Sequence, residues 1–125
     1  MRRLSVTVAL AVLLTVLAAC GTGAGSGGST ISLGASSFSG TTNVTIKAGE
    51  SVTFDDSSGG THHLVTGTNG QFTAAAGAPS EFSGSAGLDL APGDNKTVTF
   101  PTAGTYQITC TIHPSMQATI TVTAA

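Results

Sequence analysis

The sequence predicts one small all-β domain, a sandwich of short strands, and three observations lead to this fold class. Five segments alternate apolar residues with threonine or another polar residue, the period-two pattern of half-buried strands. Clusters rich in Gly, Pro, Asn and Asp separate these segments, and no segment has a convincing helical pattern. Such punctuation is typical of a β-sandwich or small barrel. The expected strands are residues 44–46, 52–54, 98–100, 106–110 and 118–122.

The N-terminus has the features of a bacterial lipoprotein signal peptide over residues 1–19. Two arginines form a positive region, residues 4–17 are apolar, and small residues lead up to Cys20. This junction resembles the lipobox, in which the cysteine is acylated and begins the mature protein. We therefore expect an exported lipoprotein on the outer face of the cytoplasmic membrane, on its periplasmic or extracellular side. The alternative is an ordinary signal peptide, with Cys20 removed or left to pair with Cys110.

Residues 20–30 then hold the lipidated cysteine and a Gly/Ser-rich tether, and residues 31–125 form the folded domain. This length suits one compact core rather than two domains. After the signal peptide the chain keeps two lysines against six acidic residues, a formal charge of −4. That balance argues against nucleic acid as a partner, and anionic lipid would repel it, so membrane attachment is expected through the acyl chains alone. We expect a monomer.

The candidate metal ligands are the sulfur atoms of cysteine and methionine and the imidazole rings of histidine. Cys110 ends an expected strand, His113 and Met116 follow it in one short loop, and His62 and His63 lie upstream. Sulfur and imidazole ligands together favour copper, and two His, one Cys and a weakly held Met form a trigonal site for one-electron chemistry. Four protein ligands leave no open position for a substrate, so we do not expect an enzyme.

The residues alone leave open which of His62 and His63 binds the metal. Successive residues of a strand face opposite sides of a sheet, so His62 and His63 cannot both point at the metal, and a shift of one residue exchanges their roles. Asp55 and Asp56 precede Ser and Gly, and we interpret them as a solvated turn rather than a calcium site.

The domain resembles the cupredoxins, the plastocyanin and amicyanin family of blue-copper proteins, over essentially all of residues 31–125. Residues 44–54 are similar to the family's early strand-turn-strand, and residues 103–106 to its approach to the ligand cysteine. The Cys-x-x-His-x-x-Met spacing is similar to that of amicyanin. The resemblance implies an antiparallel Greek-key β-sandwich.

The resemblance also implies the roles of the site residues. His62 falls on the position of the first His ligand, with His63 as a partner that braces the Cys-bearing loop or as the alternative ligand. Cys110 would supply the strong thiolate bond, His113 the second imidazole and Met116 the weak axial ligand of one copper ion that cycles between Cu(I) and Cu(II).

These implications favour a type 1 copper protein that carries single electrons between redox protein partners outside the cytoplasmic membrane. By analogy with the family, the edge of the His113 ring should reach solvent within an apolar patch. The candidate neighbours of His113 in this patch are Ala76, Ala78, Pro79, Pro114 and Ala118.

The alternative function is a lipid-anchored protein for copper transport or scavenging, and a third class is a metal-free adhesion module.

Overall fold

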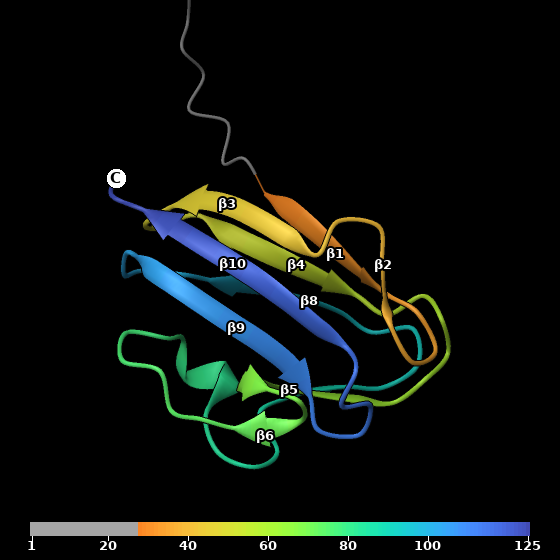
Figure 1. The fold of residues 1–125 in the computed structure, drawn as a ribbon. Helices are drawn as coiled ribbons and strands as arrows, with labels where there is room; N and C mark the ends of the chain where they lie inside the picture. The colour runs from red at the N-terminus through yellow and green to blue at the C-terminus, as the bar shows by residue number, and fades with distance from the viewer. Residues whose placement is uncertain (1–27) are drawn as a thin grey trace, which may run out of the picture.

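A computed structural model describes residues 28–125, which form two packed β-sheets (Figure 1). The signal peptide and Cys20 lie outside the described residues. The strands are β1 (Ser29–Leu33), β2 (Phe38–Ser39), β3 (Asn43–Lys47), β4 (Ser51–Asp55), β5 (His62–Thr68), β6 (Gln71–Phe72), β7 (Leu88–Leu90), β8 (Asn95–Thr99), β9 (Gly104–Cys110) and β10 (Gln117–Thr123). One 3-10 turn, η1 (Ser80–Phe82), precedes β7.

The two sheets have mixed strand directions. The first has the order β2-β1-β4-β8, and the second has the order β3-β10-β9-β5, with β6 and β7 both paired to β5. The predicted all-β sandwich is confirmed. The sheets are not wholly antiparallel, because β1 pairs with β4 and β3 pairs with β10 in parallel. The chain crosses between the two layers, which brings strands that run the same way side by side.

The alternation in the sequence explains how each strand faces the core. In β4, Val52 and Phe54 are fully buried, while the hydroxyls of Ser51 and Thr53 face outward. These hydroxyls pair across the strands with Thr99 and Thr97 of β8, at 2.8 and 2.9 Å. One face of the pair therefore supplies apolar area to the core, and the other carries a ladder of hydroxyl contacts.

Aromatic rings fill the larger gaps between the sheets. Phe82 of η1 packs against Phe54 edge to face, with ring centroids 5.6 Å apart, and against Phe100 at 5.8 Å. Phe100 in turn contacts Tyr106 of β9 at 5.7 Å.

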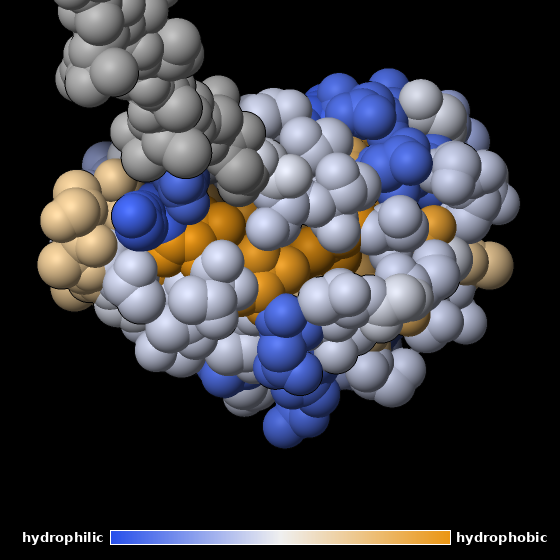
Figure 2. Space-filling model, turned by 90° about the horizontal axis from the view of Figure 1, so that it is seen from above, coloured by the Kyte–Doolittle hydropathy of each residue, from blue (hydrophilic) through white to orange (hydrophobic). Residues whose placement is uncertain are grey.

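Figure 2, which looks onto the molecule from above, shows hydrophobic residues as a stripe through the middle of this face, with polar and charged residues on both sides.

Several connections meet at one end of the sandwich. The loop from β9 to β10 and the connection from β4 to β5 both lie at the right of Figure 1. The end at which these connections meet is where the predicted ligands lie.

Between residues 28 and 125, we find no helix that is long and apolar enough to cross a membrane.

Candidate metal centre

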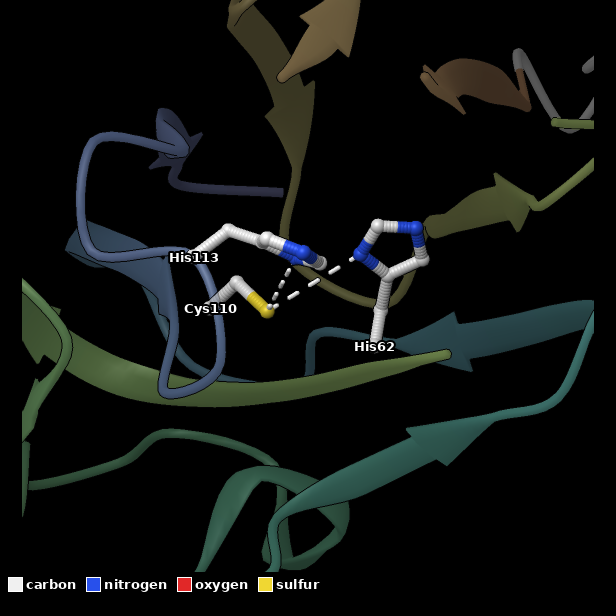
Figure 3. Close-up of side chains that lie close together, drawn as sticks. All are labelled: His62, Cys110 and His113. Atoms are coloured by element: carbon white, nitrogen blue, oxygen red, sulfur yellow. Dashed lines mark hydrogen bonds between the residues drawn. The ribbon is translucent and has the colours of Figure 1, made fainter. Parts of the chain in front are cut away.

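Three of the predicted ligands converge at the loop-rich end of the sandwich. The ligand atoms of His62, Cys110 and His113 all lie within 4.8 Å of one another. The Sγ of Cys110 is 3.9 Å from Nδ1 of His62 and 3.7 Å from Nδ1 of His113, and both nitrogens point at the sulfur (Figure 3). His62 and Cys110 are fully buried, and His113 is half-buried. The cluster joins parts of the chain that are 48 residues apart.

The β9–β10 loop is held by its own backbone. The amide of Cys110 donates to the carbonyl of Met116 at 3.1 Å, and the amide of Met116 donates to the carbonyl of His113 at 2.9 Å. Pro114 lies between them and has a fixed φ. These hydrogen bonds close a tight turn, so Cys110 and His113 keep their relative positions without help from a metal.

A second hairpin rests on this loop. The turn between β5 and β6 places the amide of Gly70 2.8 Å from Oγ1 of Thr109, and the side-chain amide of Gln117 donates to Oδ1 of Asn69 at 3.0 Å. A Cβ at Gly70, whose φ is +72°, would lie 3.1 Å from Pro114. Only a residue without a side chain fits this close approach, which braces the ligand loop from outside.

The structure places His62 in the cluster and His63 outside it. The register of β5 and β9 pairs Leu64 with Cys110, and His62 lies on the same side of β5 as Leu64. The His63 ring faces the other way and is 36% exposed, with Nε2 3.3 Å from Oδ1 of Asp89. The bracing contact from this position is made by its backbone, because the His63 carbonyl accepts from the amide of Thr111 at 3.0 Å.

Met116 ends the ligand loop, directly before β10. Its side chain is buried and belongs to the apolar core between the sheets. The backbone of the loop brings Met116 next to Cys110, because the Met116 carbonyl accepts from the Cys110 amide. This placement suits a weak metal ligand and a core residue equally. The donor set of His62, Cys110 and His113 is what favours a role for Met116 as a weak ligand.

The spacing of the donors fits a transition metal. Bonds of about 2.0 Å to nitrogen and about 2.3 Å to sulfur, as for zinc, meeting at roughly 120°, separate the two donor atoms by about 3.7 Å. The two measured separations are 3.7 and 3.9 Å. The rings of His62 and His113 have centroids 5.2 Å apart and are tilted by 52°, so neither blocks the other. A thiol with two imidazoles is a donor set that suits copper.

Burial prepares His62 for metal binding. Desolvation lowers the pKa of His62 below its ordinary value, the Asp56 carboxylate offsets part of this effect, and the nearby His113 lowers the pKa further. The neutral imidazole is the form that binds metal. Less free energy is therefore needed to remove a proton from this ring before it binds.

Asp56 is the site residue that the sequence interpretation missed. We expected a solvated turn, but the side chain is fully buried, and Oδ1 lies 3.8 Å from Nε2 of His62. Asp56 follows directly after β4, whose inward residues are Val52 and Phe54, so the period of two places it on the buried face. That continued alternation was the available signal, and the turn-like composition of the segment concealed it.

Fold and site together define a β-sandwich of the cupredoxin class, with a buried cluster of one sulfur and two imidazoles at one end. The model of the copper binding proteins of the plastocyanin/azurin family matches residues 30–123. The chain belongs to this family, and its cofactor is one copper ion. Proteins of this class are electron carriers rather than enzymes.

Individual relatives agree with this membership. A plastocyanin of Scenedesmus fuscus is 38% identical over 81 residues, which cover 63% of this chain and 80% of that protein. The crystal structure of amicyanin from Paracoccus versutus matches with a TM-score of 0.59 and 25% identity, over 78% of this chain and 82% of that chain. A Cu(I) form of an amicyanin variant matches with a TM-score of 0.58 and 22% identity, over 78% and 83% of the two chains, and this shows the fold.

The apolar surface near the ligand loop differs in detail from the expectation. Pro79 and Ala118 are buried, so they cannot form a patch on the surface. Among the described residues, the large hydrophobic side chains that are exposed are Ile112, at 45%, and Phe72, at 41%. Ile112 directly precedes His113 in the chain, so this exposed hydrophobic residue lies beside the outer edge of the cluster.

Proposed function

We propose that this protein is a type 1 copper protein that carries single electrons between redox proteins, with His62, Cys110, His113 and Met116 as its metal ligands. The observation that carries the proposal is the convergence of one buried sulfur with two Nδ1 atoms at 3.7 and 3.9 Å. Bound copper would supply a one-electron couple between Cu(I) and Cu(II). With four protein ligands, no position stays open for a substrate.

The protein's part in electron transfer is to keep the donors in place. The backbone hydrogen bonds of the β9–β10 loop hold Cys110 and His113, and the pairing of β5 with β7, in which His62 lies opposite Leu90, holds His62. A frame that is formed before the metal binds changes little when the charge at the site changes. Little rearrangement means a small barrier to each transfer.

His113 is the ligand that a partner protein can reach from the surface. Its ring is half-buried, in contrast to the fully buried His62 and Cys110, and the exposed Ile112 and Pro114 flank it in the chain. We infer that a redox partner docks on this edge, with apolar contacts around the ring that exclude water. The electron then crosses through the imidazole of His113.

We also propose the domain division that the sequence predicts. Residues 1–19 direct export, residues 20–30 anchor and tether the protein through Cys20, and residues 31–125 are the copper domain. Mass spectrometry of the protein from membranes tests this division, because a diacylated Cys20 at the new N-terminus adds a characteristic mass. An unmodified chain cleaved elsewhere would contradict the anchor and leave the copper site untouched.

Voltammetry of the copper-loaded protein tests the electron-transfer role. We expect a reversible one-electron wave and full recovery of the absorption after a cycle of reduction and oxidation. Copper that leaves the protein on reduction, measured in the filtrate after ultrafiltration, would contradict the role as an electron carrier and favour copper transport. Cys110→Ser serves as the matched control, because it keeps the size of the side chain and removes the sulfur.

A further inference from the structure

The back of the His62 ring faces a carboxylate that the ligand set does not use. Asp56 Oδ1 lies 3.8 Å from His62 Nε2, and both side chains are fully buried. Among the described residues, Nε2 of His62 and Oδ2 of Asp56 have no hydrogen-bond partner. A buried polar atom without a partner costs about 1–3 kcal/mol, so such a pair is not explained by the stability of the fold alone.

Asp56 is fixed in this position by its backbone and by one side-chain contact. Its amide donates to the carbonyl of Asp94 at 2.8 Å, and its carbonyl accepts from the amide of Gly93 at 2.7 Å. The hydroxyl of Ser58 donates to Oδ1 at 2.8 Å. The carboxylate therefore cannot turn toward solvent unless these contacts break, and it stays directed at His62.

Gly60 closes the space behind the ring. A Cβ at this position would lie 3.0 Å from Nε2 of His62, which is tighter than ordinary packing. A side chain at this position would therefore require the His62 ring to shift by a few tenths of an ångström. Figure 3 shows Nδ1 of His62 directed at Cys110 and the other ring nitrogen directed away from it. The second nitrogen therefore faces the protein interior, where Asp56 is the charged group within reach.

We propose that Asp56 is a positioning residue of the copper centre, whose carboxylate accepts a hydrogen bond from the Nε2–H of His62 when Nδ1 binds the metal. This inference rests on the proposed ligand set. The two atoms need to approach by about 0.6 Å to reach the upper limit of such a bond, near 3.2 Å. The bond fixes the proton on Nε2 and leaves Nδ1 free to bind, as partners of metal-binding histidines commonly do.

The carboxylate also affects which oxidation state is favoured. Cu(II) carries one more positive charge than Cu(I), so a buried negative charge behind a ligand stabilises Cu(II) more. The hydrogen bond acts in the same direction, because it makes the imidazole a stronger donor to the metal. Asp56 therefore lowers the reduction potential.

The test compares Asp56→Asn with Asp55→Asn by voltammetry of the copper-loaded protein. The two variants lose the same charge from neighbouring residues, but Asp55 is half-buried and lies on the opposite side of β4. We expect Asp56→Asn to weaken Cu(II) binding relative to Cu(I) about tenfold, which for one electron raises the potential by about 59 mV. A rise no larger than that of Asp55→Asn overturns the proposal.

A second measurement uses the diamagnetic Cu(I)-loaded protein, in which the proposed bond is formed, and does not depend on the redox couple. In ¹H–¹⁵N NMR spectra, His62 should carry its proton on Nε2, with slow exchange against water, and the proton signal should move upfield in Asp56→Asn. A His62 ring with its proton on Nδ1, or a signal that the substitution does not move, contradicts the proposal. A residue with a purely structural role would lower the melting temperature and leave both readouts unchanged.

Ser58→Ala keeps the inference testable if Asp56→Asn does not fold. Removing the Ser58 hydroxyl breaks the side-chain contact that directs the carboxylate at His62. The hydrogen bond to His62 should therefore weaken and the potential should rise, and an unchanged or lowered potential counts against the proposal. Failure of the ligand set itself looks different, because His62→Ala would then stay blue while the Asp56 variants behave like Asp55→Asn.

Discussion

Replacing each of the two adjacent histidines with alanine separates the metal ligand from its neighbour. In the metal-free protein, His63→Ala removes an exposed contact with Asp89, whose side chain is 65% exposed, and such pairs contribute about 0.2–1 kcal/mol. His62→Ala removes a fully buried ring, and a large-to-small change in a core costs about 2–5 kcal/mol. Part of that cost is offset, because the substitution also removes the unpaired Nε2, worth about 1–3 kcal/mol. The middles of these two ranges differ by about 1.5 kcal/mol, which is the net loss that we expect for His62→Ala.

The effects on copper should differ much more than the effects on stability. His62→Ala removes one of three strong donors, so the blue colour should be lost and Cu(II) should bind weakly, whereas His63→Ala should stay blue with an unchanged copper stoichiometry. Urea unfolding of the metal-free variants gives the stabilities, and titration with Cu(II) followed by visible absorption gives the site. If both variants stay blue, or if only His63→Ala loses colour, the assignment of the ligand is refuted.

Three further predictions follow from the same site. Met116→Leu should keep the blue colour and raise the reduction potential, measured by voltammetry, because losing a donor and gaining hydrocarbon beside the metal destabilises the more highly charged Cu(II) more than Cu(I). The metal-free protein should lose stability as the pH falls from about 6.5 toward the lowered pKa of His62, by at most about 1.4 kcal/mol per pH unit, since only the unfolded chain takes up this proton in that window. Urea melts at several pH values check this slope, and His62→Gln should remove it. Copper at a hundred times its dissociation constant should raise the free energy of unfolding by about 2.7 kcal/mol, and a melting temperature that does not respond to copper contradicts a site in the folded state.

The parts of the candidate site that the sequence predicts most directly are those that lie in one short segment. Cys110, His113 and Met116 are close together in the chain, so their spacing predicts a shared turn without knowledge of the fold. Strand alternation also shows that one of His62 and His63 faces inward. It does not say which one, because that depends on the register in which β5 pairs with β9, and register is a contact between distant parts of the chain.

Other features depend on contacts that composition does not record. The Asp56 segment reads as a turn because Asp, Ser and Gly follow one another, yet its backbone is bonded to Asp94 and Gly93 of a distant turn, which extends the inward alternation of β4 by one step. The parallel pairing of β1 with β4 and of β3 with β10 was also missed, since alternation gives the face of a strand and not its direction.

Titration of the purified protein with Cu(II), followed by visible absorption, tests the central claim most directly, because only a thiolate bonded to Cu(II) gives such a site its intense colour. We predict a blue band that saturates at one copper per chain and is absent from Cys110→Ser. A protein that stays colourless with one equivalent of Cu(II), or a Cys110→Ser variant as blue as the natural sequence, would contradict the account.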